Sequence, residues 1–194
     1  MLKKILNYIF NDNVFYLVAL VDRWASFRIR KAKGRIELKK IKNKGENCKI
    51  HGEVTIAYPD KIKMSENVRI GYGCHFFCMG GLNIGANTQI SRNVLIYTAN
   101  HNIDGTAIPY DDKYILKPVT IGKSVWIGMN VTISPGVNIG DGAVIGMGTV
   151  VSKDVPKGAI VVGAAQRVIK HRDLKDFYDK DKNRRYFSEI WPDN

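Results

Sequence analysis

The chain has 194 residues, 45% of them hydrophobic, which is enough to bury a core and makes a single domain the default expectation. The net charge of +12 is unevenly placed, because residues 1–49 hold 13 Lys/Arg against 4 Asp/Glu while residues 50–165 are nearly neutral. Three cysteines without framework spacing suit a reducing compartment rather than a disulfide-stapled secreted domain. The longest apolar run, Val14 to Val21, is too short to span a bilayer, which needs roughly 20 residues. We therefore expect a soluble, cytoplasmic protein.

The basic N-terminal segment, residues 1–33, is expected to be helical, with Gly34 ending the helix. Its apolar residues recur at helical spacing and its end is rich in Arg and Lys. Two roles stay open for it. It could pack against the rest of the chain and cap exposed strand edges, or it could make peripheral contact with the inner face of the membrane. No nucleic-acid-binding motif accompanies the charge, so nucleic acid is not expected as a partner.

From residue 50 onward, apolar residues recur at six-residue intervals. The longest unbroken series is Ile121, Ile127, Ile133, Ile139, Ile145 and Val151, and a second apolar series precedes its later members by two residues. A helix of 3.6 residues per turn would scatter this pattern, whereas a multiple of two keeps it on one face of a strand. Glycine follows four members of the first series, where it lets the chain bend at places where a Cβ would clash. This pattern predicts an all-β solenoid of hexapeptide repeats.

Residues 101–118 interrupt the repeat and form an ejected loop. An irregular segment of this length in a compact domain is usually functional, and insertions in solenoids map to one face, often the binding face. His101 lies where the repeat breaks, and a neutral imidazole is suited to accept a proton near pH 7. His101 is therefore the candidate catalytic residue.

Other chemistries receive less support from the sequence. No two histidines are closely spaced, so no metal site is expected. Gly71-Tyr72-Gly73 lacks the strand–turn–helix setting of a dinucleotide site. Cys74 and Cys78 have no second cysteine pair and are expected to be buried as apolar residues.

Residues 118–169 resemble the hexapeptide-repeat acyltransferases, and most closely the maltose, galactoside and exopolysaccharide O-acetyltransferases. The resemblance is carried by Val125-Trp-Ile-Gly, Ser134-Pro-Gly-Val, the Ser152-Lys-Asp-Val-Pro turn and a histidine before the loop. It implies a left-handed parallel β-helix that assembles as a homotrimer, with acetyl-CoA in the groove between neighbouring solenoids. The implied reaction is direct acetyl transfer to a hydroxyl of a sugar or surface-polysaccharide precursor, without a metal.

The resemblance also assigns roles to individual residues. His101 matches the general base, and Trp126 matches the tryptophan at the acceptor and acetyl end, for which Asn100 and His75 are further candidates. Cofactor-binding positions match Met129 and Met147 along the pantetheine arm, where the backbone amide near Met129 is also a candidate oxyanion donor. Positions around the nucleotide end match Ser152, Lys153, Arg167 and Lys170.

Two departures from the family pattern stand out. Gly163-Ala164-Ala165-Gln166-Arg167 replaces the usual Gly-x-Pro-x-Lys/Arg, so the turn lacks its proline. Sugar acetyltransferases often place an asparagine one turn before the histidine, where this chain has Cys74 and His75.

The expected organisation is a basic helical arm (residues 1–49), a left-handed β-helix acetyltransferase domain (50–169) and a short C-terminal helical tail (170–194). Serine and nucleotide-sugar acyltransferases share such a solenoid, but their large N-terminal domains do not fit this short arm. Two alternatives stay open: an antibiotic (xenobiotic) acetyltransferase, and a non-catalytic scaffold that acts through the basic arm.

Overall fold

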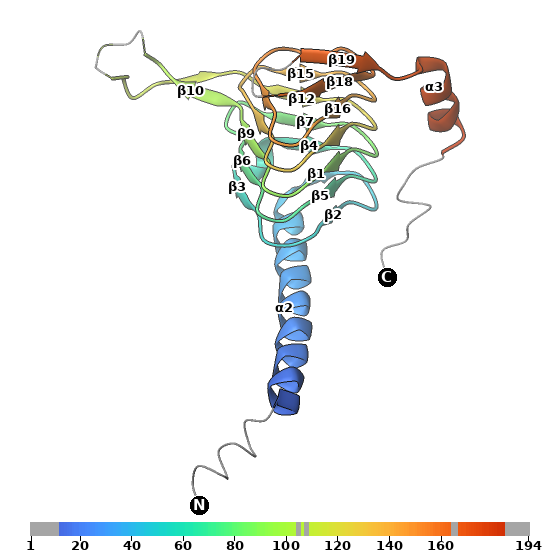
Figure 1. Ribbon diagram of the computed structural model, residues 1–194. Coiled ribbons are helices and arrows are strands. Elements are labelled where there is room, and N and C mark those ends of the chain that lie inside the picture. Colours follow the sequence, from blue (N-terminus) through green and yellow to red (C-terminus); the bar gives the residue numbers. More distant parts are fainter. Residues whose placement is uncertain (1–11, 104–105, 107–108, 164–166, 185–194) are drawn as a thin grey trace, which may run out of the picture.

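The computed structural model describes residues 12–103, 106, 109–163 and 167–184. They form a three-sided parallel β-solenoid, preceded by a long helix and followed by a short one (Figure 1). The predicted left-handed parallel β-helix is confirmed. The chain winds repeatedly through three sheets, A, B and C, which make up the three faces of the solenoid.

The strands are short, and their bounds follow the hexapeptide spacing. Sheet A contains β1 (Asn43–Lys44), β4 (Ile62–Met64), β7 (Leu82–Ile84), β12 (Val119–Ile121) and β15 (Asn138–Ile139). Sheet B contains β2 (Lys49–Ile50), β5 (Arg69–Ile70), β8 (Gln89–Ile90), β13 (Trp126–Ile127), β16 (Val144–Ile145), β18 (Ala159–Val162) and the antiparallel β19 (Arg167–His171). Sheet C contains β3 (Thr55–Ala57), β6 (His75–Phe77), β9 (Leu95–Tyr97), β14 (Thr132–Ile133) and β17 (Val150–Val151), and a 3-10 turn at Pro59–Lys61 joins β3 to β4.

The core consists of columns of apolar residues, one from each coil. In the regular part, Ile127 pairs in register with Ile145, and Ile133 pairs with Val151, so each coil takes 18 residues. In the first coils Ile50 pairs with Ile70, which is 20 residues away. The residues of these coils that point into the core still pair in register, although the coils are two residues longer and the six-residue period is broken.

The glycines of the repeat allow the coils to stack closely rather than to bend. A Cβ on Gly128 would lie 2.7 Å from the backbone nitrogen of Met147 in the next coil, closer than such atoms can approach. The bend itself falls two residues later, at Asn130, whose φ is +57°. Asparagine tolerates this left-handed conformation better than most residues.

The N-terminal helix is longer than the sequence indicated. α2 (Asp12–Lys40) passes through Gly34, so the prediction that Gly34 ends the helix is wrong. A Cβ at Gly34 would lie 1.9 Å from the carbonyl oxygen of Ile50, so this glycine instead lets the helix touch sheet B. Ile41, directly after the helix, is fully buried, whereas residues 14–33 of the helix are almost entirely exposed.

The two helices that flank the solenoid leave it at different places (Figure 1). α2 projects from the open end beside β2, and strand pairing already begins at β1, inside the segment expected as the arm. At the other end α3 (Leu174–Lys182) is capped by Asp173, whose side chain accepts hydrogen bonds from the backbone nitrogens of Lys175 and Asp176. In the described part of the chain, no helix is long and apolar enough to cross a membrane.

Candidate active site

The segment that interrupts the repeat is a β-hairpin rather than an irregular loop. β10 (Ala99–His101) pairs antiparallel with β11 (Tyr114–Leu116), and the pair projects from the corner between sheets C and A (Figure 1). At its base the backbone nitrogen of Lys117 donates to the carbonyl oxygen of Thr98 at 2.8 Å. The hairpin therefore leaves and re-enters the solenoid at one hydrogen-bonded point.

A buried carboxylate braces the outer part of the hairpin. Asp111 is 7% exposed and accepts hydrogen bonds from the side-chain amide of Asn102, at 3.0 Å, and from the backbone nitrogen of Lys113, at 2.9 Å. Its own backbone nitrogen donates to the carbonyl oxygen of Asn102. These bonds join the two sides of the hairpin immediately beyond His101.

His101 is half-buried between two tyrosine rings. Its ring centroid lies 3.8 Å from that of Tyr110, nearly parallel, and 4.6 Å from that of Tyr114, which is its strand partner. Nδ1 is buried, and no described residue forms a hydrogen bond with it. The imidazole is thus held in one orientation by ring packing. Asn100, the preceding residue, points to the opposite face of the strand and is exposed.

A row of aromatic rings connects His101 to His75 on sheet C. The Tyr114 centroid is 6.1 Å from that of Phe77, which stacks on Tyr97 at 5.2 Å. Tyr97 in turn stacks on His75 at 6.0 Å. Two candidate residues distant in sequence therefore lie on one continuous aromatic surface.

Trp126 lies on a different face from His101. It stands on β13 in sheet B and is 57% exposed. Met129 and Met147 lie at the corner between sheets B and C, in two successive coils. These coils are hydrogen-bonded to each other there, because the N–H of Gly148 donates to the carbonyl oxygen of Met129. Arg92 occupies the same corner one coil earlier, and its Nε donates to the sulfur of Met129 at 2.9 Å.

The remaining candidates are also divided between faces. Ser152 and Lys153 are exposed at the corner that follows sheet C, two coils beyond the hairpin. Arg167 and Lys170 lie on β19, next to β18 in sheet B. The candidates therefore form two groups. The group at the corner between sheets C and A contains His101, Ser152 and Lys153. The group on sheet B and at the corner between sheets B and C contains Trp126, Met129, Met147, Arg167 and Lys170.

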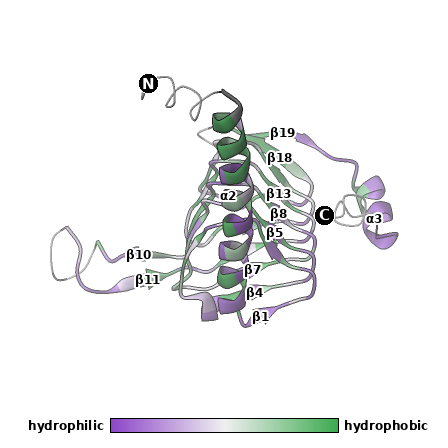
Figure 2. Cartoon of the chain, turned by 90° about the horizontal axis from the view of Figure 1, so that it is seen from below, coloured by the Kyte–Doolittle hydropathy of each residue, from purple (hydrophilic) through white to green (hydrophobic). Residues whose placement is uncertain are grey.

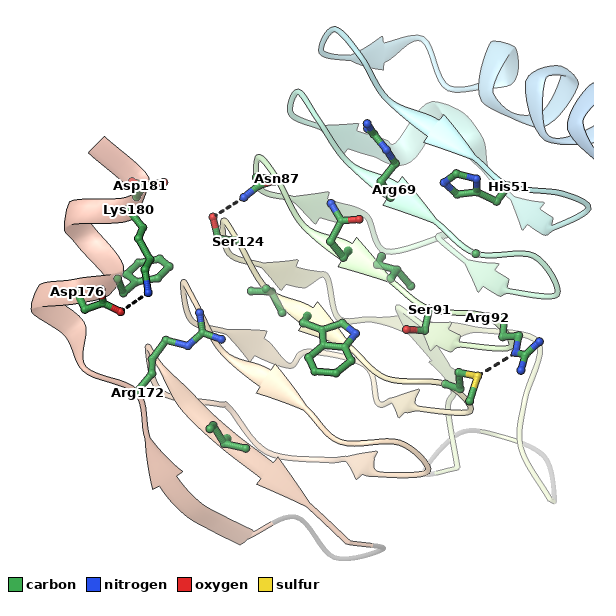
Figure 3. Close-up of a pocket in the computed structure, with 18 of the residues that line it drawn as sticks. His51, Arg69, Asn87, Ser91, Arg92, Ser124, Arg172, Asp176, Lys180 and Asp181 are labelled. Atoms are coloured by element: carbon green, nitrogen blue, oxygen red, sulfur yellow. Dashed lines mark hydrogen bonds and ion pairs between the residues drawn. The ribbon is translucent and has the colours of Figure 1, made fainter. Parts of the chain in front are cut away.

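A groove of about 1060 Å³ runs along sheet B on the side of Trp126 (Figure 3). α3, which carries Lys180, forms one wall together with Arg172, which precedes the helix, and Arg92 stands at the opposite end. Beside Trp126, the side-chain nitrogen of Gln89 is buried, and none of the described residues accepts a hydrogen bond from it. The groove therefore combines an indole, an unused amide donor, and both cations and carboxylates, among which Lys180 and Asp176 form an ion pair at 2.6 Å.

Cys74 and Cys78 are unsuited to act as nucleophiles. Burial raises the pKa of Cys74 to about 11 and that of Cys78 to about 12. Both are essentially inaccessible, which confirms the prediction that they are buried apolar residues. Their thiols stay protonated at neutral pH, and a thiolate is the form that attacks. Within the described ranges, no three His, Cys, Asp or Glu side chains gather as a metal site.

Comparisons with known proteins agree with this architecture. Residues 118–153 match the family model of the bacterial transferase hexapeptide (six repeats). A maltose O-acetyltransferase from Clostridium difficile 630 is 38% identical, with a TM-score of 0.59, over 67% of this chain and 66% of that one. A galactoside acetyltransferase in complex with coenzyme A is 32% identical, with a TM-score of 0.63, over 69% and 66% of the two chains.

A third similar structure covers more of the fold. The hexapeptide-repeat acetyltransferase of Vibrio cholerae complexed with acetyl coenzyme A matches 85% of this chain and 92% of its own, with a TM-score of 0.64 and 23% identity. At that identity the likeness concerns the fold alone. The family model and the two sugar acetyltransferases agree with the predicted family. The chain belongs to the hexapeptide-repeat acyltransferases.

Sequence reasoning missed several residues near the candidate site: Tyr110, Tyr114, Tyr97, Phe77, Asp111 and Gln89. The hairpin contains an aromatic–aliphatic stretch, Tyr114-Ile-Leu, that could have indicated a strand. No local signal would have shown that Phe77 and Tyr97 meet it, because that contact depends on the stacking of coils.

Proposed function

We propose that the protein transfers an acetyl group from acetyl-CoA to a hydroxyl of a sugar or surface-polysaccharide precursor. The observation that carries the proposal is the imidazole of His101, held between two tyrosine rings at the base of the hairpin, on a solenoid similar to that of sugar acetyltransferases.

In the proposed reaction His101 acts as the general base. It removes the proton of the acceptor hydroxyl as the oxygen attacks the thioester carbonyl. The new C–O bond forms, the C–S bond breaks, and the thiol of coenzyme A leaves after receiving a proton. No acyl-enzyme is formed, which agrees with the buried, protonated state of Cys74 and Cys78. Such a base contributes typically 10²–10⁴-fold to the rate.

A homotrimer would complete the site. His101 lies at the C–A corner of one chain and Trp126 on its sheet B, so a single chain holds them on different faces. In a ring of three copies, the C–A corner of one copy would face sheet B of the next. Acetyl-CoA would then lie between them, with Met129 and Met147 along the pantetheine arm and Ser152, Lys153, Arg167 and Lys170 toward the nucleotide end.

The aromatic row supports a saccharide acceptor. Tyr97 and Tyr114 are each more than one-third exposed and lie in line with His101 and His75. Flat aromatic rings offer apolar surface with a polar edge, which suits the C–H faces of sugar rings between their hydroxyls. His75 would then contact the acceptor at the end of the row.

The general base is tested with purified protein, acetyl-CoA, and a panel of mono- and oligosaccharides plus chloramphenicol and streptogramins, by following release of free thiol. His101→Ala should lower turnover at least 100-fold. The matched control is His171→Ala, which removes an exposed histidine on β19 and should leave turnover unchanged. Near-normal thiol release by His101→Ala would refute the assignment.

The shared site is tested by complementation between two variants. His101→Ala and Trp126→Ala are each expected to be inactive as pure assemblies. When the two are co-expressed, about a quarter of the sites in random mixed trimers should combine an intact histidine with an intact tryptophan from the next copy. If the co-expressed protein stays as inactive as either variant alone, the site lies within one chain and the proposal of a shared groove is wrong.

A further inference from the structure

The first half of α2 exposes apolar side chains that the solenoid does not cover. Exposed fractions are 61% for Leu17, 59% for Val18, 58% for Val21 and 65% for Trp24. In Figure 2 the turns of α2 nearest the end marked N are mostly green (hydrophobic), and the later turns alternate between green and purple (hydrophilic). Stable monomeric proteins rarely leave such a contiguous apolar surface in water, and patches of this kind mark sites of interaction with a protein or a membrane.

The distribution of these residues around the helix identifies the kind of occupant. From Val14 to Val21 every residue is apolar or aromatic, and at 100° per residue they cover the whole circumference. A partner helix of a second copy would need a stripe on one side and would leave the other sides wet. Surroundings that are apolar on all sides, such as the acyl chains of a bilayer, would remove the apolar side chains of residues 14–21 from water around the whole circumference of the helix.

Directly after this apolar block, the helix becomes strongly basic. Residues 22–40 contain two acidic side chains and eight basic ones: Arg23, Arg28, Arg30, Lys31, Lys33, Arg35, Lys39 and Lys40. Trp24 stands at the boundary, with the guanidinium of Arg28 5.7 Å from the centre of its ring. Tryptophan and basic residues are the groups that favour the headgroup layer of an anionic membrane.

The base of the helix is fixed to the solenoid, so the apolar block is held at its outer end. Gly34 packs against Ile50, and Lys33 forms an ion pair with Glu53 at 2.6 Å. The eight residues of the block are about 12 Å long, which is comparable to the hydrocarbon thickness of one leaflet and too short to span two.

We propose that α2 docks the protein on anionic phospholipid bilayers, with residues 14–21 entering one leaflet and the basic band at the headgroups. The docking is independent of acetyl transfer, because the helix contributes no residue to the proposed site. It would place the solenoid beside the membrane surface with the hairpin free.

The test is co-sedimentation of the full chain with vesicles of phosphatidylcholine containing 30% phosphatidylglycerol, and with pure phosphatidylcholine. We expect binding to the anionic vesicles that weakens at high salt. Leu17→Gln/Val18→Gln/Val21→Gln should weaken it at least 100-fold, and Arg23→Gln/Arg28→Gln/Lys31→Gln about 100-fold. Glutamine is a good helix former, so both variants keep the helix. The matched control is Ala32→Gln/Ile36→Gln, on the same helix outside the block, which should bind within twofold of the unaltered chain.

Three results would overturn the proposal. The unaltered chain could stay in the supernatant with both vesicles, or sediment equally with both at every salt concentration. In the third result, the unaltered chain binds no vesicles, and light scattering shows that the triple apolar variant has a smaller assembly than the unaltered chain. The apolar block would then be covered by a second copy of the chain and not by a membrane. Thiol release with soluble acceptors, measured without vesicles, reports the proposed function separately, and all the α2 variants should retain it.

Discussion

A glycine beneath the hairpin provides a test of how the solenoid positions His101. A Cβ on Gly80 would lie 2.0 Å from the carbonyl oxygen of Thr98 and 3.0 Å from the backbone nitrogen of Lys117, the two atoms whose hydrogen bond closes the hairpin base. The Gly80 N–H also donates to the hydroxyl of Thr98 at 2.8 Å. Gly80→Ala must therefore push the hairpin away by roughly 1 Å.

The expected consequence is a large loss of activity with a small loss of stability. A misplacement of about 1 Å at a reacting group can cost about 100-fold in rate. Losing two hydrogen bonds costs about 2 kcal/mol, which for a chain of this size lowers the Tm by roughly 4–8 °C. We expect kcat/KM of Gly80→Ala, measured by thiol release, to fall about 100-fold while the far-UV circular dichroism remains that of the solenoid.

The control carries a similar clash far from the hairpin. A Cβ on Gly45 would lie 2.5 Å from the backbone nitrogen of Glu66, at the corner between sheets A and B near the open end of the solenoid. Gly45→Ala should lower the Tm comparably but leave kcat/KM within a few-fold. Normal activity in folded Gly80→Ala, or an equal loss in Gly45→Ala, would refute the reasoning.

Two further predictions concern the core. Thr149 is fully buried in the column that contains Val131, and its hydroxyl has no hydrogen-bond partner among the described residues. Because burying an unpaired hydroxyl is unfavourable, Thr149→Val should raise the free energy of unfolding by about 1–3 kcal/mol, measured by urea denaturation. An unchanged or lower value would show that the hydroxyl is satisfied. Burial raises the pKa of Cys74 to about 11 and that of Cys78 to about 12 from 9.0 in the unfolded chain, so their stabilising effect is complete below pH 9 and is lost as the pH rises from 9 toward 12. Denaturation at pH 8.5 and 10.5 should show this loss, and Cys74→Val should reduce it. An equal pH dependence in Cys74→Val would count against a contribution from that thiol.

The solenoid could be predicted from the sequence because each coil repeats the same local requirement. Residues such as Ile121 and Ile139 pair directly with one another, so the spacing in the sequence is also the register in the sheet. The first coils were harder to recognise, since their 20-residue length breaks the six-residue period at a corner. The end of α2 was predicted wrongly because Gly34 is required for contact with Ile50, and a glycine at a close contact looks in sequence like a helix stop.

The arrangement of the candidate site was less accessible to sequence reasoning. The hairpin lies between His101 and Trp126 in the sequence and interrupts the six-residue repeat. The repeat therefore cannot be followed from one residue to the other to find that they lie on different faces. The rings around His101 come from the β11 side of the hairpin (Tyr110 and Tyr114) and, beyond them, from two coils of sheet C (Phe77 and Tyr97). Their contacts arise from tertiary stacking, which no local pattern records.

The hairpin also has an evolutionary consequence. Ile96 and Ile133 pair directly although 37 residues separate them, because the insertion starts and ends at one hydrogen-bonded corner. Extra length there shifts no column of the core, and lengthening a closed loop costs little free energy. Selection can therefore lengthen, shorten or exchange this segment while the scaffold beneath it stays the same.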